Sequence, residues 1–191
     1  MARANLSVSI AAETRTAVCA LVPEAGAVVG KWRARYDPSA AAGMAAHLTL
    51  LFPFAPLAEI AGDLEAKLAN VIAGAAPFPV SFSKLRRWPG VLWLAPDDPA
   101  PLEALIAALA HAFPTYLPYG GAHDTITPHL TVAEIKEGDD IEGTVDRIEA
   151  AFAANALARL PIRATISEVW LLAERHGRWR AVRPYRLGGR P

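Results

Sequence analysis

Histidine and threonine recur together in two short stretches that follow one pattern. The first is His47–Leu50, which reads HLTL, and the second is His129–Val132, which reads HLTV. Successive side chains of a β-strand point to opposite faces, so each stretch would place its histidine and threonine on one face and its apolar residues on the other. Chance placement gives this pattern about 0.07 times in a chain of this composition. Two copies therefore favour a pair of strands that present polar groups to a cleft.

Two imidazoles facing one cleft are suited to general acid–base catalysis. The reference pKa of histidine is about 6.5, so near neutral pH one ring can be neutral while its partner carries a proton. The neutral ring can take a proton from water or a hydroxyl, and the protonated ring can give one to a leaving oxygen. The threonine hydroxyls can donate hydrogen bonds to oxygens on which charge develops. A tetrahedral phosphate fits this layout, whereas acyl transfer would need a nucleophile, and the sequence has no G-x-S-x-G motif.

Other interpretations of the histidine pair stay open at this point. A single such histidine is more typical of a hydrogen-bonded core residue, although the matched pair disfavours that interpretation. A metal-dependent hydrolase would need a third ligand, and neither motif supplies a carboxylate two or four residues after its histidine. A non-catalytic module that binds a nucleotide or an RNA end could use the same cleft.

Residues outside the motifs offer weaker candidates for substrate contacts. Tyr119 is a candidate for stacking on a nucleobase, and Arg87 is a candidate for steering a phosphate. His123 precedes the second motif and could reach the cleft. Four tryptophans are expected to pack within hairpin strands, with one of them as an alternative stacking residue: Trp88, Trp93, Trp170 and Trp179.

Apolar periodicity predicts the elements that position the motifs. Strands are expected at 16–22, 47–52, 78–83, 91–94, from 129 onward, 162–173 and 179–187, and helices at 57–73, 98–113 and 141–152. A short helix is expected within 24–46, ending before Asp37. The stretch 114–128 is expected to form a loop because it contains several prolines and glycines.

The order of these elements repeats along the chain. A motif strand, a helix and a hairpin occupy 47–95 and again 129–187. The two motif histidines are 82 residues apart, and the same offset relates Trp88 to Trp170. We therefore expect an α+β fold of two strand–helix–hairpin units related by a pseudo-two-fold axis. Two antiparallel sheets would surround a central cleft, with the helices outside.

Composition limits the class of protein. The chain has 191 residues, 53% of them hydrophobic, and no net charge, so one domain over 1–191 is expected, with two lobes that each carry one motif. Zero net charge argues against binding of long nucleic acid, although eight arginines against two glutamates from Arg159 onward could attract phosphate. One cysteine, no signal-peptide pattern and no long apolar run predict a cytoplasmic protein without a membrane span. We expect a monomer.

The two motifs and their spacing resemble the two-histidine phosphoesterase superfamily. The stretch His47–Phe54, which reads HLTLLFPF, is similar to its 2′-5′ RNA ligase-like branch. The resemblance implies hydrolysis of 2′,3′-cyclic phosphates on RNA ends or small nucleotides without a metal or other cofactor, and 2′-5′ RNA ligation as a further activity. By motif, His47 and His129 would be catalytic, and Thr49 and Thr131 would bind the phosphate. The motifs leave open which histidine is the acid and which is the base.

Overall fold

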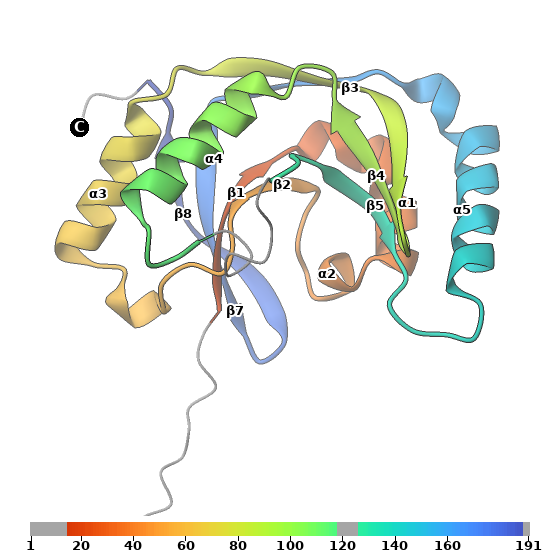
Figure 1. Ribbon diagram of the computed structural model, residues 1–191, viewed down its shortest axis with the longest axis horizontal. Coiled ribbons are helices and arrows are strands. Elements are labelled where there is room, and N and C mark those ends of the chain that lie inside the picture. Colours follow the sequence, from red (N-terminus) through yellow and green to blue (C-terminus); the bar gives the residue numbers. More distant parts are fainter. Residues whose placement is uncertain (1–14, 118–125, 189–191) are drawn as a thin grey trace, which may run out of the picture.

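In the described part of the chain, eight β-strands form two antiparallel four-stranded sheets (Figure 1). A computed structural model describes residues 15–117 and 126–188. The strands are β1 (Thr16–Leu21), β2 (His47–Leu51), β3 (Phe78–Trp88), β4 (Val91–Pro96), β5 (Leu130–Glu134), β6 (Ile162–Ile166), β7 (Glu168–Arg175) and β8 (Arg178–Arg186). Sheet A has the order β2-β1-β7-β8, and sheet B has the order β5-β4-β3-β6. The expected fold class, α+β with two antiparallel sheets, is confirmed.

The two sheets have equivalent layouts, but each combines strands from both halves of the sequence. The motif strand β2 lies in the sheet that contains the later hairpin β7–β8, and the motif strand β5 lies beside the earlier hairpin β3–β4. Both motif strands are edge strands, and they contact each other where the sheets meet. The crossed arrangement therefore brings the two motifs together at the centre of the molecule.

A β-bulge occurs at the same point of both motif strands. In sheet A the register shifts so that Cys19 pairs with Thr49 and Val18 pairs with Leu51, which leaves Leu50 as the extra residue. In sheet B a shift after Thr131 leaves Val132 as the extra residue between pairs with Trp93 and Leu92. A bulge changes the alternation of faces. It therefore allows two consecutive residues of each strand to be buried, Leu50–Leu51 and Val132–Ala133.

The longer helices cover the faces of the sheets that point away from the cleft. The α-helices are α1 (Gly26–Tyr36), α2 (Pro38–Ala41), α3 (Gly62–Ala73), α4 (Ala100–Ala112) and α5 (Ile141–Asn155), with short 3₁₀ turns η1 (Pro23–Ala25), η2 (Leu57–Glu59) and η4 (Leu157–Arg159). Helix α4 packs on β2 and on α3, which contacts β8, while α1 packs on β5 and α5 packs on β4. Figure 1 accordingly shows α3 and α4 at one end of the molecule and α5 at the other.

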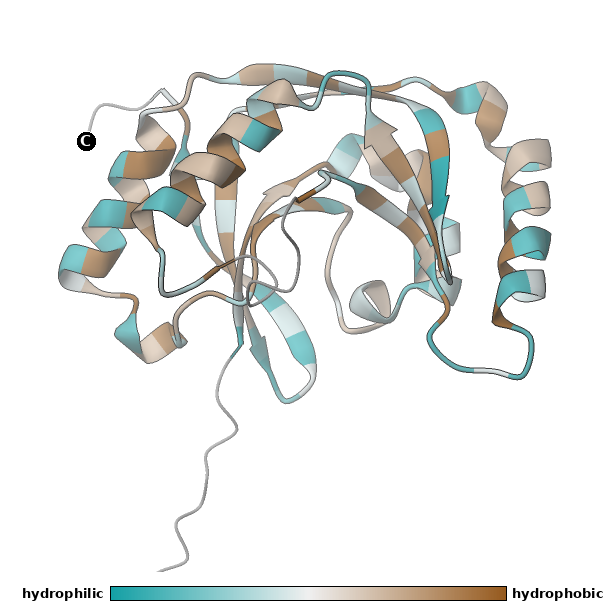
Figure 2. Cartoon of the chain, viewed as in Figure 1, coloured by the Kyte–Doolittle hydropathy of each residue, from teal (hydrophilic) through white to brown (hydrophobic). Residues whose placement is uncertain are grey.

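One hydrophobic core joins both sheets. The apolar side chains of the motif strands enter it and are at most 1% exposed: Leu48, Leu50, Leu130 and Val132. Figure 2 shows apolar residues concentrated on the strands and on the helix faces that cover them, whereas the tip of the β7–β8 hairpin is hydrophilic. Burial of these leucine and valine side chains fixes which face of each motif strand is turned to the cleft.

Among the expected elements, one is divided in the structure and another begins later than expected. The stretch 162–173 is not one strand, because Ser167 separates β6, which pairs with β3 in sheet B, from β7, which pairs with β1 in sheet A. Apolar periodicity detects both strands but contains no information on their partners. The expected helix over 57–73 begins only at Gly62, after the 3₁₀ turn η2 and a residue in extended conformation, Ala61.

Candidate active site

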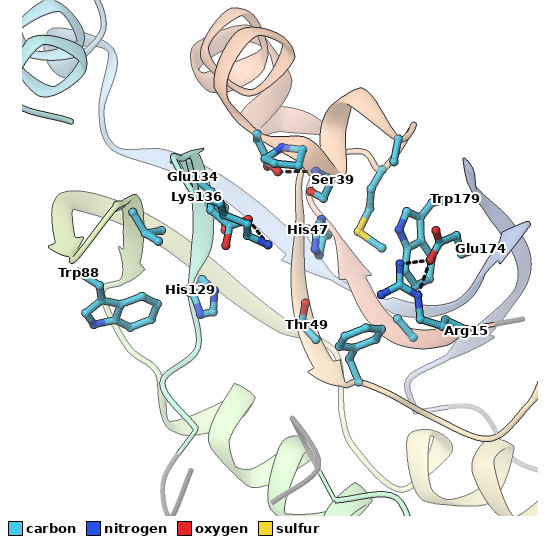
Figure 3. A pocket seen from close by; sticks show the side chains of 18 of the residues that line it. Arg15, Ser39, His47, Thr49, Trp88, His129, Glu134, Lys136, Glu174 and Trp179 are labelled. Atoms are coloured by element: carbon cyan, nitrogen blue, oxygen red, sulfur yellow. Dashed lines mark hydrogen bonds and ion pairs between the residues drawn. The ribbon is translucent and has the colours of Figure 1, made fainter. Parts of the chain in front are cut away.

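A cavity of about 780 Å³ lies between the two motif strands. All four motif side chains line it: His47, Thr49, His129 and Thr131. Figure 3 shows His47 and Thr49 on β2 opposite His129, which immediately precedes β5. The four side chains are partly buried, while the residues between them point into the core. The volume lies within the range of pockets that hold small-molecule ligands.

The two imidazoles are held in the same way. His47 Nδ1 lies 2.8 Å from the carbonyl oxygen of Ala45, and His129 Nδ1 lies 2.9 Å from that of Thr127. A carbonyl can only accept a hydrogen bond, so Nδ1 of each neutral ring must donate the proton. This tautomer leaves Nε2 of each ring unprotonated and available to a ligand in the cavity.

The electrostatic environments of the two rings differ. Burial, reinforced by the positive charge of Arg33, lowers the pKa of His47 to about 4. Burial also lowers the pKa of His129, but the Thr127 carbonyl and the negative charge of Glu134 oppose this shift. Both rings are therefore neutral at pH 7 in the free protein, and His129 is the one with an acidic neighbour that favours protonation.

Aromatic side chains border the cavity on both sides. Trp88 lines it beside His129, with the two rings edge-to-face and their centroids 4.8 Å apart. On the other side, Phe52 and Trp179 form an edge-to-face pair with centroids 6.0 Å apart. Trp88 and Trp179 are thus the predicted tryptophans that reach the cavity. Trp93 and Trp170 pack beside it instead, against Trp88 and in the smaller hydrophobic cluster of sheet A respectively.

Among the described residues, the cations that line the cavity are paired with carboxylates. Arg15 Nε donates a hydrogen bond of 2.6 Å to Glu174, and Lys136 Nζ lies 3.2 Å from Glu134. Figure 3 shows Arg15 and Glu174 beside Trp179, beyond His47. Glu134 and Lys136 lie near His129 and extend toward His47. A bound phosphate would therefore depend on the motif side chains more than on an unpaired surface cation.

The predicted residues outside the motifs have different outcomes. Arg87 does not line the cavity, because its guanidinium binds three carboxylates of α5: Glu142, Asp146 and Glu149. The arginine fastens β3 to α5, and this geometry gives no support to a role in phosphate steering. Tyr119 and His123 lie outside the described residues.

Several cavity residues have no sequence motif that would have identified them. Asp37 and Glu134 line the cavity, and Arg33 lies behind it, 3% exposed. In the sequence, Arg33 stands among Lys31, Trp32 and Arg35 and looks like a residue of a solvated helix face. Only the packing of α1 on β5 reveals that this arginine is buried beside the motifs.

Neither a metal cluster nor a membrane helix is evident in the part of the chain that the structure describes. Over residues 15–117 and 126–188, no three His, Cys, Asp or Glu side chains gather as ligands for one ion. Within the same ranges, every helix is too short or too polar to cross a bilayer.

Comparison with known proteins agrees with this geometry. Residues 21–178 match the family model described as the 2′-5′ RNA ligase superfamily. The fold is similar to that of E. coli LigT complexed with 3′-AMP, with a TM-score of 0.57, 19% identity and coverage of 92% of this chain and 99% of that one. It is also similar to TT0787 of Thermus thermophilus, with a TM-score of 0.59, 16% identity and coverage of 92% and 98%. No curated protein sequence matches the chain.

Proposed function

The chain belongs to the 2′-5′ RNA ligase superfamily of two-histidine phosphoesterases, and from this premise we propose that it hydrolyses 2′,3′-cyclic phosphates. The observation that carries the proposal is the convergence of His47, Thr49, His129 and Thr131, from strands of different sheets, on one cavity. The resemblance gives the class of enzyme, and the cavity supplies a pair of proton carriers with two hydroxyls beside them.

We assign the base to His47 and the acid to His129 in the direction of hydrolysis. Neutral His47 takes a proton from water, and the oxygen of that water attacks phosphorus. The bond from phosphorus to one ribose oxygen breaks, and protonated His129 gives its proton to that oxygen. Arg33 disfavours the protonated form of His47, whereas Glu134 favours that of His129, which supports this division.

The threonines are proposed to bind the oxygens of phosphorus that do not react. Thr49 and Thr131 stand two residues after the histidines on the same strand faces, and both line the cavity. Donors placed at the oxygens where charge develops stabilise the transition state more than the ground state. The same proton transfers, with an RNA 5′ hydroxyl in place of water and with O3′ as the leaving oxygen, would join that hydroxyl to a 2′,3′-cyclic phosphate and give a 2′-5′ link.

We propose that the substrate is an RNA end or a small cyclic nucleotide. Trp88 on one side of the histidines and Phe52 with Trp179 on the other offer aromatic surfaces for a nucleobase. E. coli LigT, which has a similar fold, has been crystallised with 3′-AMP and with ATP. A cavity of about 780 Å³ is large enough for a mononucleotide or the terminal part of an RNA strand.

The proposal is tested by incubating the purified protein with each 2′,3′-cyclic nucleotide, with and without a chelator, and separating the products. We expect hydrolysis to a nucleoside monophosphate that the chelator does not abolish. Activity that disappears with chelator and returns with a divalent cation would instead indicate a metal-dependent hydrolase. Binding of the nucleotides without turnover across the pH range would indicate a non-catalytic module.

A further inference from the structure

The guanidinium of Arg33 connects the backbones of the two motifs. Its Nη1 donates a hydrogen bond of 3.0 Å to the carbonyl oxygen of Thr131, in the second motif. Its Nη2 donates bonds of 3.0 and 3.1 Å to the carbonyl oxygens of Met44 and Ala45, just before the first motif. Arg33 belongs to α1, so one side chain from outside both sheets joins the strands on which the histidines lie.

The contact at Ala45 reaches the first histidine directly. The carbonyl oxygen of Ala45 accepts a hydrogen bond from Arg33 and also the one from His47 Nδ1. The carbonyl that sets the tautomer and the orientation of His47 is therefore itself oriented by Arg33. Within the described residues, Arg33 and His47 are the two side chains that form hydrogen bonds with this oxygen.

Asp37 holds the guanidinium at this place. Its Oδ2 lies 2.7 Å from Arg33 Nη1, and the side chains of Asp37 and Arg33 are 1% and 3% exposed. The other carboxylate oxygen, Oδ1, accepts a bond of 2.8 Å from the backbone nitrogen of Ser39, which ties the pair to the start of α2. The buried carboxylate therefore limits where the guanidinium of Arg33 can lie.

We propose that Arg33 is a positioning residue that fixes the two histidines relative to each other. This inference rests on the proposed function of the cavity, because it concerns the alignment of His47 and His129 on one phosphorus atom. Arginine suits the task because its planar fork can donate to several carbonyls at once, which a lysine ammonium on a flexible stem cannot do with fixed angles. A misplacement of about 1 Å can cost about 10²-fold in rate.

The first test is Arg33→Lys, which keeps the charge beside Asp37 but loses the fork. We expect kcat on a 2′,3′-cyclic nucleotide to fall about 10- to 100-fold, with KM raised no more than about tenfold. The matched control is Arg183→Lys, because Arg183 forms an ion pair with Glu65 of α3 and does not line the cavity. An Arg33→Lys enzyme that is folded and keeps its kcat would overturn the proposal.

A second variant removes the charges of the pair together. Arg33→Met alone would leave Asp37 buried without a partner, so Arg33→Met/Asp37→Asn is made instead. With this variant folded at the assay temperature, as shown by its melting curve, we again expect a loss of kcat. If the pair had only a structural role, the double variant would have a lower Tm but an unchanged kcat below its thermal unfolding transition. That result would contradict a positioning role.

Inorganic phosphate provides a readout that does not depend on turnover. In wild-type protein, phosphate should shift the ring signals of His47 and His129 in ¹H–¹⁵N spectra, with one common Kd. Arg33→Lys should raise this Kd about tenfold, since the two phosphate-binding strands lose their common anchor. Unchanged binding at both rings would speak against the inference. Absence of turnover in wild-type protein with this phosphate response intact would instead refute the proposed hydrolase and leave the positioning role supported.

Discussion

The Nδ1 atom of each motif histidine is bound to the carbonyl of the residue two positions earlier, Ala45 for His47 and Thr127 for His129. This repeated contact holds both rings in the same tautomer, with the proton on Nδ1 and with Nε2 unprotonated. The difference between the rings comes from their neighbours, Arg33 on one side and Glu134 on the other. Equivalent positions thus have different electrostatic environments, which suits the opposite roles that we propose for them.

Loss of either imidazole should remove most of the activity. We expect His47→Ala and His129→Ala each to lower kcat for cyclic nucleotide hydrolysis by about 10²- to 10⁴-fold, the usual contribution of a general acid or base. Thr49→Ala and Thr131→Ala should lower kcat by a smaller factor and should mainly raise KM. Steady-state kinetics measure these changes. The control is His111→Ala, because His111 is an exposed histidine on α4. A near-normal rate in either motif histidine variant would remove that residue from the mechanism.

The pH dependence follows from the two histidine environments. The proposed hydrolysis needs His47 neutral and His129 protonated, so kcat/KM of the free enzyme should rise as pH increases through the His47 pKa of about 4. It should fall again as pH increases through the pKa of His129, which is lowered from 6.5. We therefore expect a bell-shaped profile with its maximum on the acidic side of neutrality. Replacing Glu134 with Gln should move the basic limb to lower pH, and an unmoved limb would contradict the assignment of His129 as the acid.

The motif residues could be predicted from the sequence because strand alternation and a repeated pattern define them. Arg33 and Asp37 could not, since what matters is which backbone carbonyls lie near them after folding. The candidate role of Arg87 illustrates the reverse problem, because this basic residue is held by the carboxylates of α5 instead of facing the cavity. Charge in a sequence indicates what a side chain can bind, and packing decides what it does bind.

At the scale of single elements, the turn between β3 and β4 fixes the end of β5. Gly90, with φ of +73°, accepts a hydrogen bond of 2.8 Å from the Ile135 backbone nitrogen and donates one of 2.7 Å to Glu142. A Cβ atom at Gly90 would lie 2.7 Å from the Ile135 carbonyl oxygen. The turn therefore needs glycine for its backbone conformation and for the close approach of the next strand.

Two glycine-to-alanine substitutions should have opposite effects on stability. Gly90→Ala should destabilise the protein by about 1–2 kcal/mol or more, because the residue must adopt a left-handed conformation and also displaces β5. Gly30→Ala should stabilise it by about 0.5–1 kcal/mol, since this position lies within α1 and nothing occupies the space of the new Cβ. Urea unfolding of both variants measures the difference. Equal effects would show that the turn tolerates a side chain.

Most elements could be predicted from periodicity, including the hairpins β3–β4 and β7–β8. Their pairing could not, because the pattern of β6 and β7 is continuous and only Ser167 separates strands that belong to different sheets. The bulges after Thr49 and Thr131 were not predicted either. Pairs of buried residues such as Leu50–Leu51 signal a bulge only when the partner strand is known.

At the scale of the whole molecule, the internal repeat and the sheets do not coincide. Each sheet takes its motif strand from one half of the chain and its hairpin from the other. The cavity consequently receives His47 from sheet A and His129 at the edge of sheet B. Arg33 of α1 donates hydrogen bonds to backbone carbonyls beside both histidines. The site exists only when the two halves are assembled, which links formation of the cavity to completion of the fold.

This arrangement predicts that neither half folds alone. In a fragment of residues 1–121, β1 would lack β7, β4 would lack β5 and β3 would lack β6. Three strands would therefore gain an unpaired edge, and one face of the core would be uncovered. We expect fragments 1–121 and 122–191 each to lack a cooperative unfolding transition in circular dichroism. Mixing them should restore the transition and the phosphate response of both histidines, because every missing strand is then supplied. A cooperative transition in fragment 1–121 alone would show instead that the first half forms its own core, and the site would then be a junction between two independent units.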